Sequence, residues 1–185
     1  MRESIDVFEH APQILRGLKG GVLLTAAADG KANPMTIGWG TLGIEWGKPV
    51  FVCYVRTGRY THGLLDRAGE FTVNVPLAGA GAADEARVRE VLSVCGTRSG
   101  RDMDKVSELG LTPVPGVDVS APGFEELPLT LECRVLYRRN QDISLLPDDV
   151  RERCYPADAP SEAAGSNRDH HTEYYGEIVN AYILR

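Results

Sequence analysis

The first group of residues with chemical potential occupies positions 55–62 (VRTGRYTH), where a predicted strand passes into a short helix. Two guanidinium groups, two threonine hydroxyls and the free backbone N–H groups of a helix N-terminus would converge there. Guanidinium groups and such N–H groups are the donors that bind a phosphate monoester. The segment therefore predicts a phosphate site, although two arginines are also typical of an ordinary solvated loop.

Two further segments could extend such a site. Residues 33–41 (NPMTIGWGT) combine a large aromatic side chain, glycines and hydroxyls on a predicted strand. Glycine lets a flat ligand approach the backbone, and backbone amides with threonine hydroxyls can bind the polar edge of a heteroaromatic ring. Residues 95–105 (CGTRSGRDMDK) place cations and a hydroxyl just before a helix, within reach of a phosphate. The alternatives are a core strand that buries Trp39 and a charged loop between helices.

The remaining reactive side chains form no familiar catalytic or metal-binding motif. His170 and His171 are adjacent, but no further ligands follow at a metal-binding spacing. The cysteines are far apart in the sequence and form no CxxC pair, which favours reduced, structural thiols: Cys53, Cys95, Cys133 and Cys154. The sequence also has no nucleophile elbow, no dinucleotide fingerprint and no P-loop. We therefore expect neither a metal centre nor a covalent nucleophile.

Composition narrows the class of protein. The 185 residues are 43% hydrophobic and carry a net charge of −6, with 26 acidic and 20 basic residues. A chain of this length can bury one sizeable core, so we expect a single domain over residues 1–185. The negative field disfavours nucleic acid as a partner. The N-terminus is too acidic for a signal peptide, and no run approaches the roughly 20 apolar residues of a membrane helix, so we expect a cytoplasmic protein without membrane contact.

The elements that must position these residues are short strands and a few helices. Strand-like length and alternation occur in residues 21–27, 34–42, 49–55, 70–76, 128–137 and 177–184. Helical spacing occurs in residues 61–68, 82–95 and 104–109, with a further turn near 148–154 inside an irregular polar stretch from 138 to 170.

Local signals place the turns and the helix ends. Asp29-Gly30 predicts a hairpin turn, Thr61 and Asp84 are candidate N-caps, and Gly96 is a candidate helix stop. Alternation in residues 128–137 predicts one solvent-facing side. Short strands joined by hairpins favour a mainly β fold, a closed or nearly closed antiparallel β-barrel with peripheral helices, over a parallel doubly wound sheet.

Four stretches, taken in order, resemble the flavin reductase-like family of FMN-binding split barrels, and especially its flavoredoxin-type branch. They are NPMTIGWG (33–40), VRTGRYTHGLL with GEFTVNVP (55–76), CGTRSGRDMDK (95–105) and HTEYYGEIV (171–179). The resemblance implies a six-stranded split barrel that forms a homodimer and binds FMN noncovalently near the subunit interface. The polar stretch between Tyr137 and His170 has no counterpart that we can map onto the family.

The resemblance also implies roles for individual residues. Along the isoalloxazine ring and ribityl chain it places Met35, Thr36, Trp39 and Thr41. At the phosphate end it places Arg56, Arg59, Tyr60 and Thr61. A further family signature is matched by Ser99, Arg101 and Lys105, and His171 would stand near the ring or an incoming nicotinamide.

The function implied is an NAD(P)H-dependent flavin reductase-like oxidoreductase. NADH or NADPH would deliver a hydride to bound FMN, and the electrons would pass to free flavin, an iron protein or oxygen. Because the cofactor carries the chemistry, no acid–base dyad is required in the sequence. One alternative is an FMN-containing, flavoredoxin-like electron carrier that a protein partner reduces, without an NAD(P)H site of its own. Another is a barrel that has lost flavin and binds a different ligand.

Overall fold

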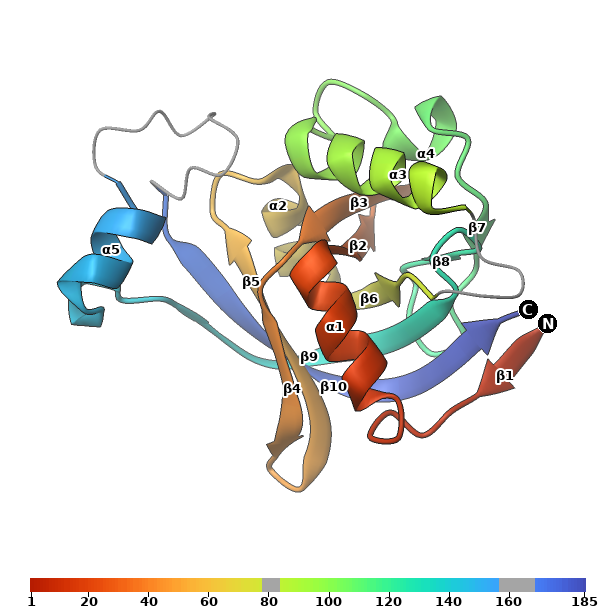
Figure 1. Cartoon of the computed structure of the whole chain (residues 1–185), viewed down its shortest axis with the longest axis horizontal. Coiled ribbons are helices and arrows are strands. Elements are labelled where there is room, and N and C mark those ends of the chain that lie inside the picture. Colours follow the sequence, from red (N-terminus) through yellow and green to blue (C-terminus); the bar gives the residue numbers. More distant parts are fainter. Residues whose placement is uncertain (78–83, 157–168) are drawn as a thin grey trace.

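A curved antiparallel sheet encloses the main hydrophobic core, and this computed structural model describes residues 1–77, 84–156 and 169–185. The strands of the large sheet are β1 Arg2–Ser4, β2 Val22–Ala28, β3 Lys31–Ile37, β4 Gly40–Glu45, β5 Lys48–Arg56, β6 Glu70–Val75, β9 Leu129–Asn140 and β10 His171–Leu184. Their order is β3-β2-β6-β9-β10-β5-β4, and β1 pairs with the C-terminal end of β10 (Figure 1). A separate small sheet pairs β7 Pro113–Val114 with β8 Gly123–Phe124. The predicted antiparallel, mainly β architecture is confirmed, with eight strands in the large sheet rather than six.

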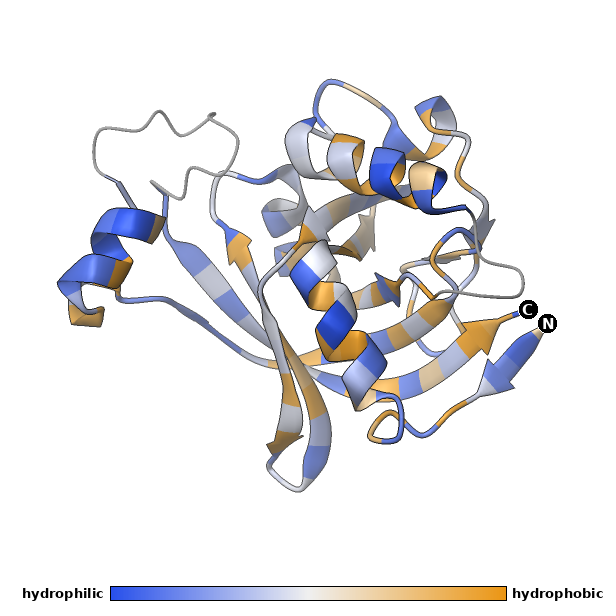
Figure 2. Ribbon diagram, viewed as in Figure 1, coloured by the Kyte–Doolittle hydropathy of each residue, from blue (hydrophilic) through white to orange (hydrophobic). Residues whose placement is uncertain are grey.

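Helices pack around this sheet. They are α1 Ala11–Gly20, α2 Tyr60–Ala68, α3 Glu85–Thr97, α4 Lys105–Glu108 and α5 Asp148–Cys154, with a short 3-10 turn at Ile143–Leu145. The sequence analysis did not predict α1, which crosses the barrel in Figure 1 and buries Ile14 and Leu18, one turn apart. Figure 2 shows the matching alternation of apolar and polar residues along α1. In the described part of the chain, none of the helices has the length and apolar character needed to cross a membrane.

The first hairpin is as predicted, but the strand expected over residues 34–42 is not. Asp29 and Gly30 both have positive φ, at 54° and 75°, as a type I′ turn requires. The expected strand is interrupted at Gly38 and Trp39, where β3 ends and β4 begins. Because β3 pairs with β2 and β4 pairs with β5, the chain must leave one end of the sheet and join the other. That break exposes Trp39 instead of burying it in the core.

The side of β9 that we expected to face water is buried over its first half. Thr130 and Glu132 have no exposed surface. The Glu132 carboxylate accepts hydrogen bonds from the backbone N–H groups of Val117 and Asp118, at 2.8 and 2.7 Å. A buried carboxylate is tolerated only with such donors, and the loop that supplies them follows β7 and covers the strand. The alternation correctly predicted a strand, but it could not reveal this cover.

Helix ends follow the predicted caps in part. Asp84 is the N-cap of α3 and accepts from Arg87 N at 2.8 Å, as predicted, and Asp104 caps α4. Gly96 does not stop α3, which continues to Thr97. The final strand begins at His171, six residues earlier than the apolar pattern indicated, because its first residues are polar but pair with β5.

Candidate functional site

A cavity of about 620 Å³ opens where α2, β3 and the loop between α3 and α4 meet, and we call it the basic pocket. It is lined by Asn33, Met35, Arg56, Gly58, Arg59, Tyr60, Thr61, Gly96, Thr97, Arg98, Ser99, Gly100, Arg101, Asp102, Met103, Lys105 and Glu108. The basic pocket brings together most of the residues that the resemblance singled out: Met35, Arg56, Arg59, Tyr60, Thr61, Ser99, Arg101 and Lys105. Residues 56–61 and residues 96–105, about forty positions apart in the sequence, thus form one surface.

The N-terminus of α2 forms one wall of the basic pocket. Its N-cap is Arg59, in an extended conformation and without a side-chain cap among the described residues, so Thr61 is not the cap that we predicted. Thr61 lies inside the helix, 1% exposed, and its Oγ1 accepts a hydrogen bond from Asn33 Nδ2 at 2.7 Å. Because the described side chains leave the first turn uncapped, backbone N–H groups there can bind a ligand, apart from that of His62, which donates to Arg59 O.

Lys105 is a buried cation in the opposite wall, only 3% exposed. Its Nζ donates to the carbonyl oxygens of Pro34 and Cys95, at 3.0 and 3.1 Å, and so connects β3 to α3. An ammonium group has three hydrogens, which leaves one for the basic pocket. Burial, with a smaller contribution from nearby Arg59, lowers the pKa of Lys105 to about 8.

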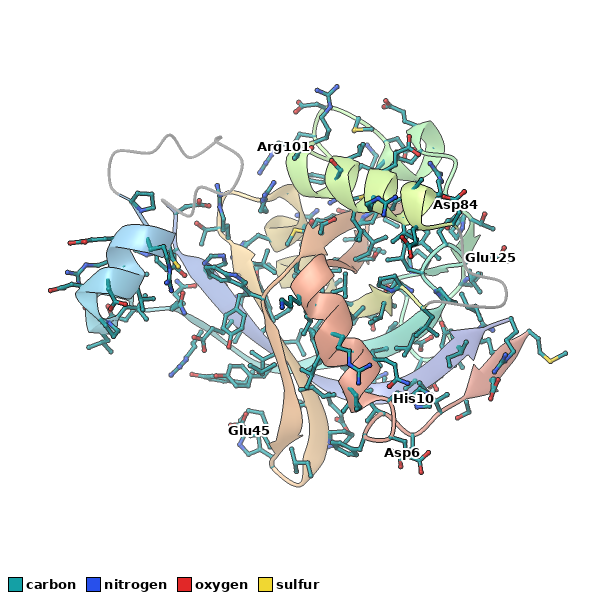
Figure 3. The ribbon with its side chains drawn as sticks, in the orientation of Figure 1. Asp6, His10, Glu45, Asp84, Arg101 and Glu125 are labelled. Atoms are coloured by element: carbon teal, nitrogen blue, oxygen red, sulfur yellow. The ribbon has the colours of Figure 1, made fainter. Side chains whose placement is uncertain are left out.

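Positive charge is crowded in this region. Burial and the neighbouring Arg56 lower the pKa of Arg59. Arg101 lies over the Tyr60 ring, 5.6 Å from its centroid, and donates to Gly58 O at 3.1 Å. Figure 3 shows Arg101 beside the end of α3. In a chain of net charge −6, such a cluster is a local field suited to an anion.

Asp169 adds an acidic group at the edge of this cluster, and sequence reasoning missed it. Its Oδ1 lies 2.7 Å from Arg56 Nε, and its Oδ2 accepts from Gly58 N at 2.7 Å. The Asp169 carboxylate thus contacts donors from the turn between β5 and α2. The geometry of these donors therefore suits an oxyanion. Asp169 belongs to the polar stretch before β10, where no local pattern marks it.

Next to Arg56 lies a second group of side chains, the Trp39–His171–Tyr155 cluster. His171 is the direct neighbour of Arg56 in the pairing of β10 with β5. The ring centroids of Trp39 and Tyr155 lie 5.1 and 5.7 Å from that of His171. Burial and the Arg56 charge lower the pKa of His171 to about 4, so the ring is neutral at physiological pH. Trp39 is 42% exposed, so part of its side chain is open to solvent.

Four of the predicted residues do not line the basic pocket: Trp39 and His171 lie in the neighbouring cluster, and Thr36 and Thr41 lie elsewhere. Thr36 donates from Oγ1 to Leu92 O at 2.6 Å, on the side of β3 opposite Met35, as strand alternation requires. Thr41 is exposed on β4 and hydrogen-bonds Tyr54. Among the described residues no group of three or more His, Cys, Asp or Glu side chains is placed to hold a metal ion. Cys95 is buried, and its pKa is raised to about 11, so its thiol is not activated.

The fold and pocket define an antiparallel-barrel protein with a cation-lined pocket near an aromatic cluster. The chain belongs to the flavin reductase like domain family, whose model matches residues 15–184. A protein of Archaeoglobus fulgidus, described only as uncharacterized, is 32% identical over 106 residues, which cover 57% of this chain and 55% of that protein. The chain thus spans little more than half of that relative's length.

Solved structures agree on the fold. Flavoredoxin from Methanosarcina acetivorans is 25% identical with a TM-score of 0.62, covering 89% of this chain and 68% of that chain. Flavoredoxin of Desulfovibrio vulgaris (Miyazaki F) is 23% identical with the same TM-score, over 89% and 69% of the two chains. The FMN-binding domain of a flavin reductases-like enzyme from Shewanella baltica OS155 gives a TM-score of 0.66 at 15% identity, over 99% and 77%. The predicted split-barrel fold is thereby confirmed.

Proposed function

We propose that this chain binds FMN noncovalently and acts with it as an NAD(P)H-dependent flavin reductase-like oxidoreductase. The observation that carries the proposal is the basic pocket, which adjoins the partly exposed Trp39 and the buried His171 in a flavin reductase like domain. A cavity of about 620 Å³ lies within the usual range for cofactor sites. Its cations and free N–H groups match a phosphate monoester, and the aromatic side matches a flat ring.

The phosphate end would be held by residues from both walls of the basic pocket: Arg56, Arg59, Tyr60, Thr61, Ser99, Arg101 and Lys105. The guanidinium of Arg59 can donate two parallel hydrogen bonds, and the ammonium of Lys105 adds a point charge from the opposite wall. The Thr61 hydroxyl oxygen accepts a hydrogen bond from Asn33 Nδ2. Its own hydrogen can therefore be donated to the ligand. A bound phosphate would bring compensating negative charge into a region where these cations lie close together.

The ring end would lie toward Met35, Trp39 and His171. Met35 is buried in the floor of the basic pocket and offers a polarizable apolar surface. Bound FMN would supply the redox chemistry, since it can take a hydride from a reduced nicotinamide and release electrons to a second acceptor. The chain's own part is to orient the ring, to hold a neutral His171 beside it and to leave one face accessible.

The proposal includes a homodimer, supported by an apolar, mostly aromatic surface that we call the aromatic patch and that consists of the exposed Ile44, Trp46 and Tyr137 and the half-buried Tyr175. Trp46 at the tip of the β4–β5 hairpin is 56% exposed, and its ring centroid lies 6.2 Å from Tyr137 and 6.0 Å from Tyr175. Figure 1 shows this hairpin extending away from the barrel. Contiguous exposed aromatics mark interaction sites more often than solvated surface.

Anaerobic mixing of the FMN-loaded protein with NADH or NADPH tests the proposal. We expect the oxidised flavin absorption to bleach within a single turnover. A protein that binds FMN but stays oxidised until a partner reductase is added would instead be an electron carrier, the second candidate, which the likeness to two flavoredoxins favours. A colourless protein that does not bind added FMN would contradict both functions.

A further inference from the structure

Tyr155 follows α5, in the polar stretch that sequence reasoning could not interpret, and its side chain turns into the site. It is 7% exposed, and its hydroxyl lies 2.9 Å from His171 Nδ1 and 2.6 Å from Gln141 Oε1. Gln141 also donates from its backbone N to His171 O at 2.8 Å. The three residues therefore form a closed ring of hydrogen bonds that fixes both the backbone and the imidazole of His171.

The direction of these hydrogen bonds determines the tautomer. Tyr155 has one hydroxyl hydrogen, and it is donated to Gln141 Oε1. With the Gln141 amide oxygen as its acceptor, the tyrosine oxygen accepts from His171, and the imidazole proton is then assigned to Nδ1. A neutral imidazole has a single N–H, which leaves Nε2 as a lone-pair acceptor. Within the described residues, the hydrogen bond of the His171 ring is the one to Tyr155.

The charges around His171 keep the ring in this neutral form. Arg56, its cross-strand neighbour, and Arg59 both disfavour an added proton, whereas Asp169 favours one. Burial and the two arginines outweigh Asp169, so the pKa of His171 lies far below its ordinary value. An imidazolium would donate from both nitrogens, whereas the neutral ring keeps one acceptor nitrogen, and its centroid lies 5.1 Å from that of Trp39.

We infer that Tyr155 is a positioning residue that holds His171 in the Nδ1–H tautomer, so that His171 Nε2 accepts a hydrogen bond from an N–H group of the bound heteroaromatic ligand. This inference rests on the proposed function for the identity of the ligand. Two ligands could supply the donor, namely the ring N–H of the flavin or the carboxamide N–H of the nicotinamide. In either case the polar stretch before β10 contributes a residue to the site.

The first test is the imidazole ¹⁵N spectrum of the protein as purified, assigned with His171→Gln. We expect an unprotonated, pyridine-type Nε2 and a protonated Nδ1 for His171. Tyr155→Phe should redistribute the ring toward the Nε2–H tautomer. Tyr182→Phe is the matched control, because it removes another buried tyrosine hydroxyl at the far end of β10. It should leave the His171 signals unchanged.

The second test separates the two ligands. The loss of one positioned hydrogen bond should weaken binding about five- to tenfold in Tyr155→Phe. A flavin donor predicts a weaker FMN Kd, whereas a nicotinamide donor predicts a higher KM for NAD(P)H at unchanged FMN Kd. In a His171→Ala background, Tyr155→Phe should have no further effect, because the two residues act through one contact.

A wild-type spectrum with the Nε2–H tautomer would overturn the inference, and this measurement needs no variant to fold. Unchanged tautomer and unchanged constants in Tyr155→Phe, or an equal loss in the His171→Ala background, would also overturn it. If the wild-type protein binds no flavin, the proposed function fails. The ¹⁵N spectrum of His171 can still be measured in that case, and it tests separately whether Tyr155 sets the tautomer.

Discussion

Asn33 Nδ2 donates a hydrogen bond to Thr61 Oγ1 across 2.7 Å, and both side chains are buried. This contact connects β3, where the proposed ring-binding stretch begins, to the first turn of α2, where the proposed phosphate donors lie. Thr61 lies two residues beyond the N-cap Arg59, and its hydroxyl oxygen can accept from Asn33 and still donate its own hydrogen to a ligand. The two halves of the proposed site are therefore held in register by one buried hydrogen bond.

Arg59→Ala should weaken FMN binding by roughly 1.5–3 kcal/mol, which is about a 10- to 150-fold rise in Kd, because a charged hydrogen bond to phosphate is lost. Riboflavin, which lacks the phosphate, should bind almost as before. Titration by flavin fluorescence measures both constants. Arg67→Ala is the control, since Arg67 lies on the same helix, half-exposed, and pairs with Asp29 instead. Equal weakening of FMN and riboflavin would place the phosphate elsewhere.

FMN affinity should fall above pH about 8, because the buried Lys105, whose pKa is lowered to about 8, then loses its charge. The fall should not exceed about tenfold per pH unit for one proton. Lys105→Met should flatten the profile between pH 8 and 10, and riboflavin binding should show no such step. An identical pH profile in Lys105→Met would rule out this role.

The same pKa shift affects stability with a defined sign. Between the folded pKa of about 8 and the ordinary value of 10.5, the unfolded chain binds more protons at Lys105 than the folded one. This residue's contribution to the free energy of unfolding of the flavin-free protein should therefore rise with pH in that window. Denaturant titrations of wild-type protein and Lys105→Met at pH 7 and 10 measure the difference.

Gly100→Ala should damage the basic pocket. A Cβ at Gly100 would collide with Asn33 Oδ1, whose amide is buried and hydrogen-bonded to Thr61, and stand 2.7 Å from Tyr60 Cδ1. Overpacking of this kind costs about 1–3 kcal/mol of stability, and here it should also weaken FMN binding. Gly20→Ala, whose Cβ would meet nothing within 4 Å, is the control. Wild-type FMN affinity in Gly100→Ala would show that the loop is not part of the site.

Trp46→Lys should dissociate the proposed homodimer, because a charge would replace the most exposed ring of the aromatic patch. Loss of a central aromatic anchor costs about 2 kcal/mol or more of association energy. Light scattering coupled to gel filtration would detect the shift to monomer, and circular dichroism should remain unchanged. Val117→Lys, an equally exposed apolar position on another loop, should remain dimeric. A wild-type monomer, or a dimeric Trp46→Lys protein, would contradict this interface.

Much of this protein could be predicted from sequence because the relevant signals are local. Alternation of apolar residues identified β6 and β9, Asp29-Gly30 identified the first hairpin, and Asp84 identified the start of α3. The order of four short stretches was sufficient to indicate the family, which the family model then confirmed. Each of these depends on neighbours within a few residues, where backbone propensities and turn chemistry act.

Tertiary structure decided the rest, because burial and hydrogen-bond partners depend on segments far apart in the chain. Glu132 is buried because the loop that follows β7 covers it and donates two backbone hydrogen bonds to its carboxylate. Asp169 and Tyr155 entered the site only because β10 pairs with both β9 and β5 and brings the polar stretch against Arg56. Thus the sequence alone determined the types of element and the chemistry of the pocket residues, whereas folding decided which of those residues meet, since a side chain's partners are set by packing.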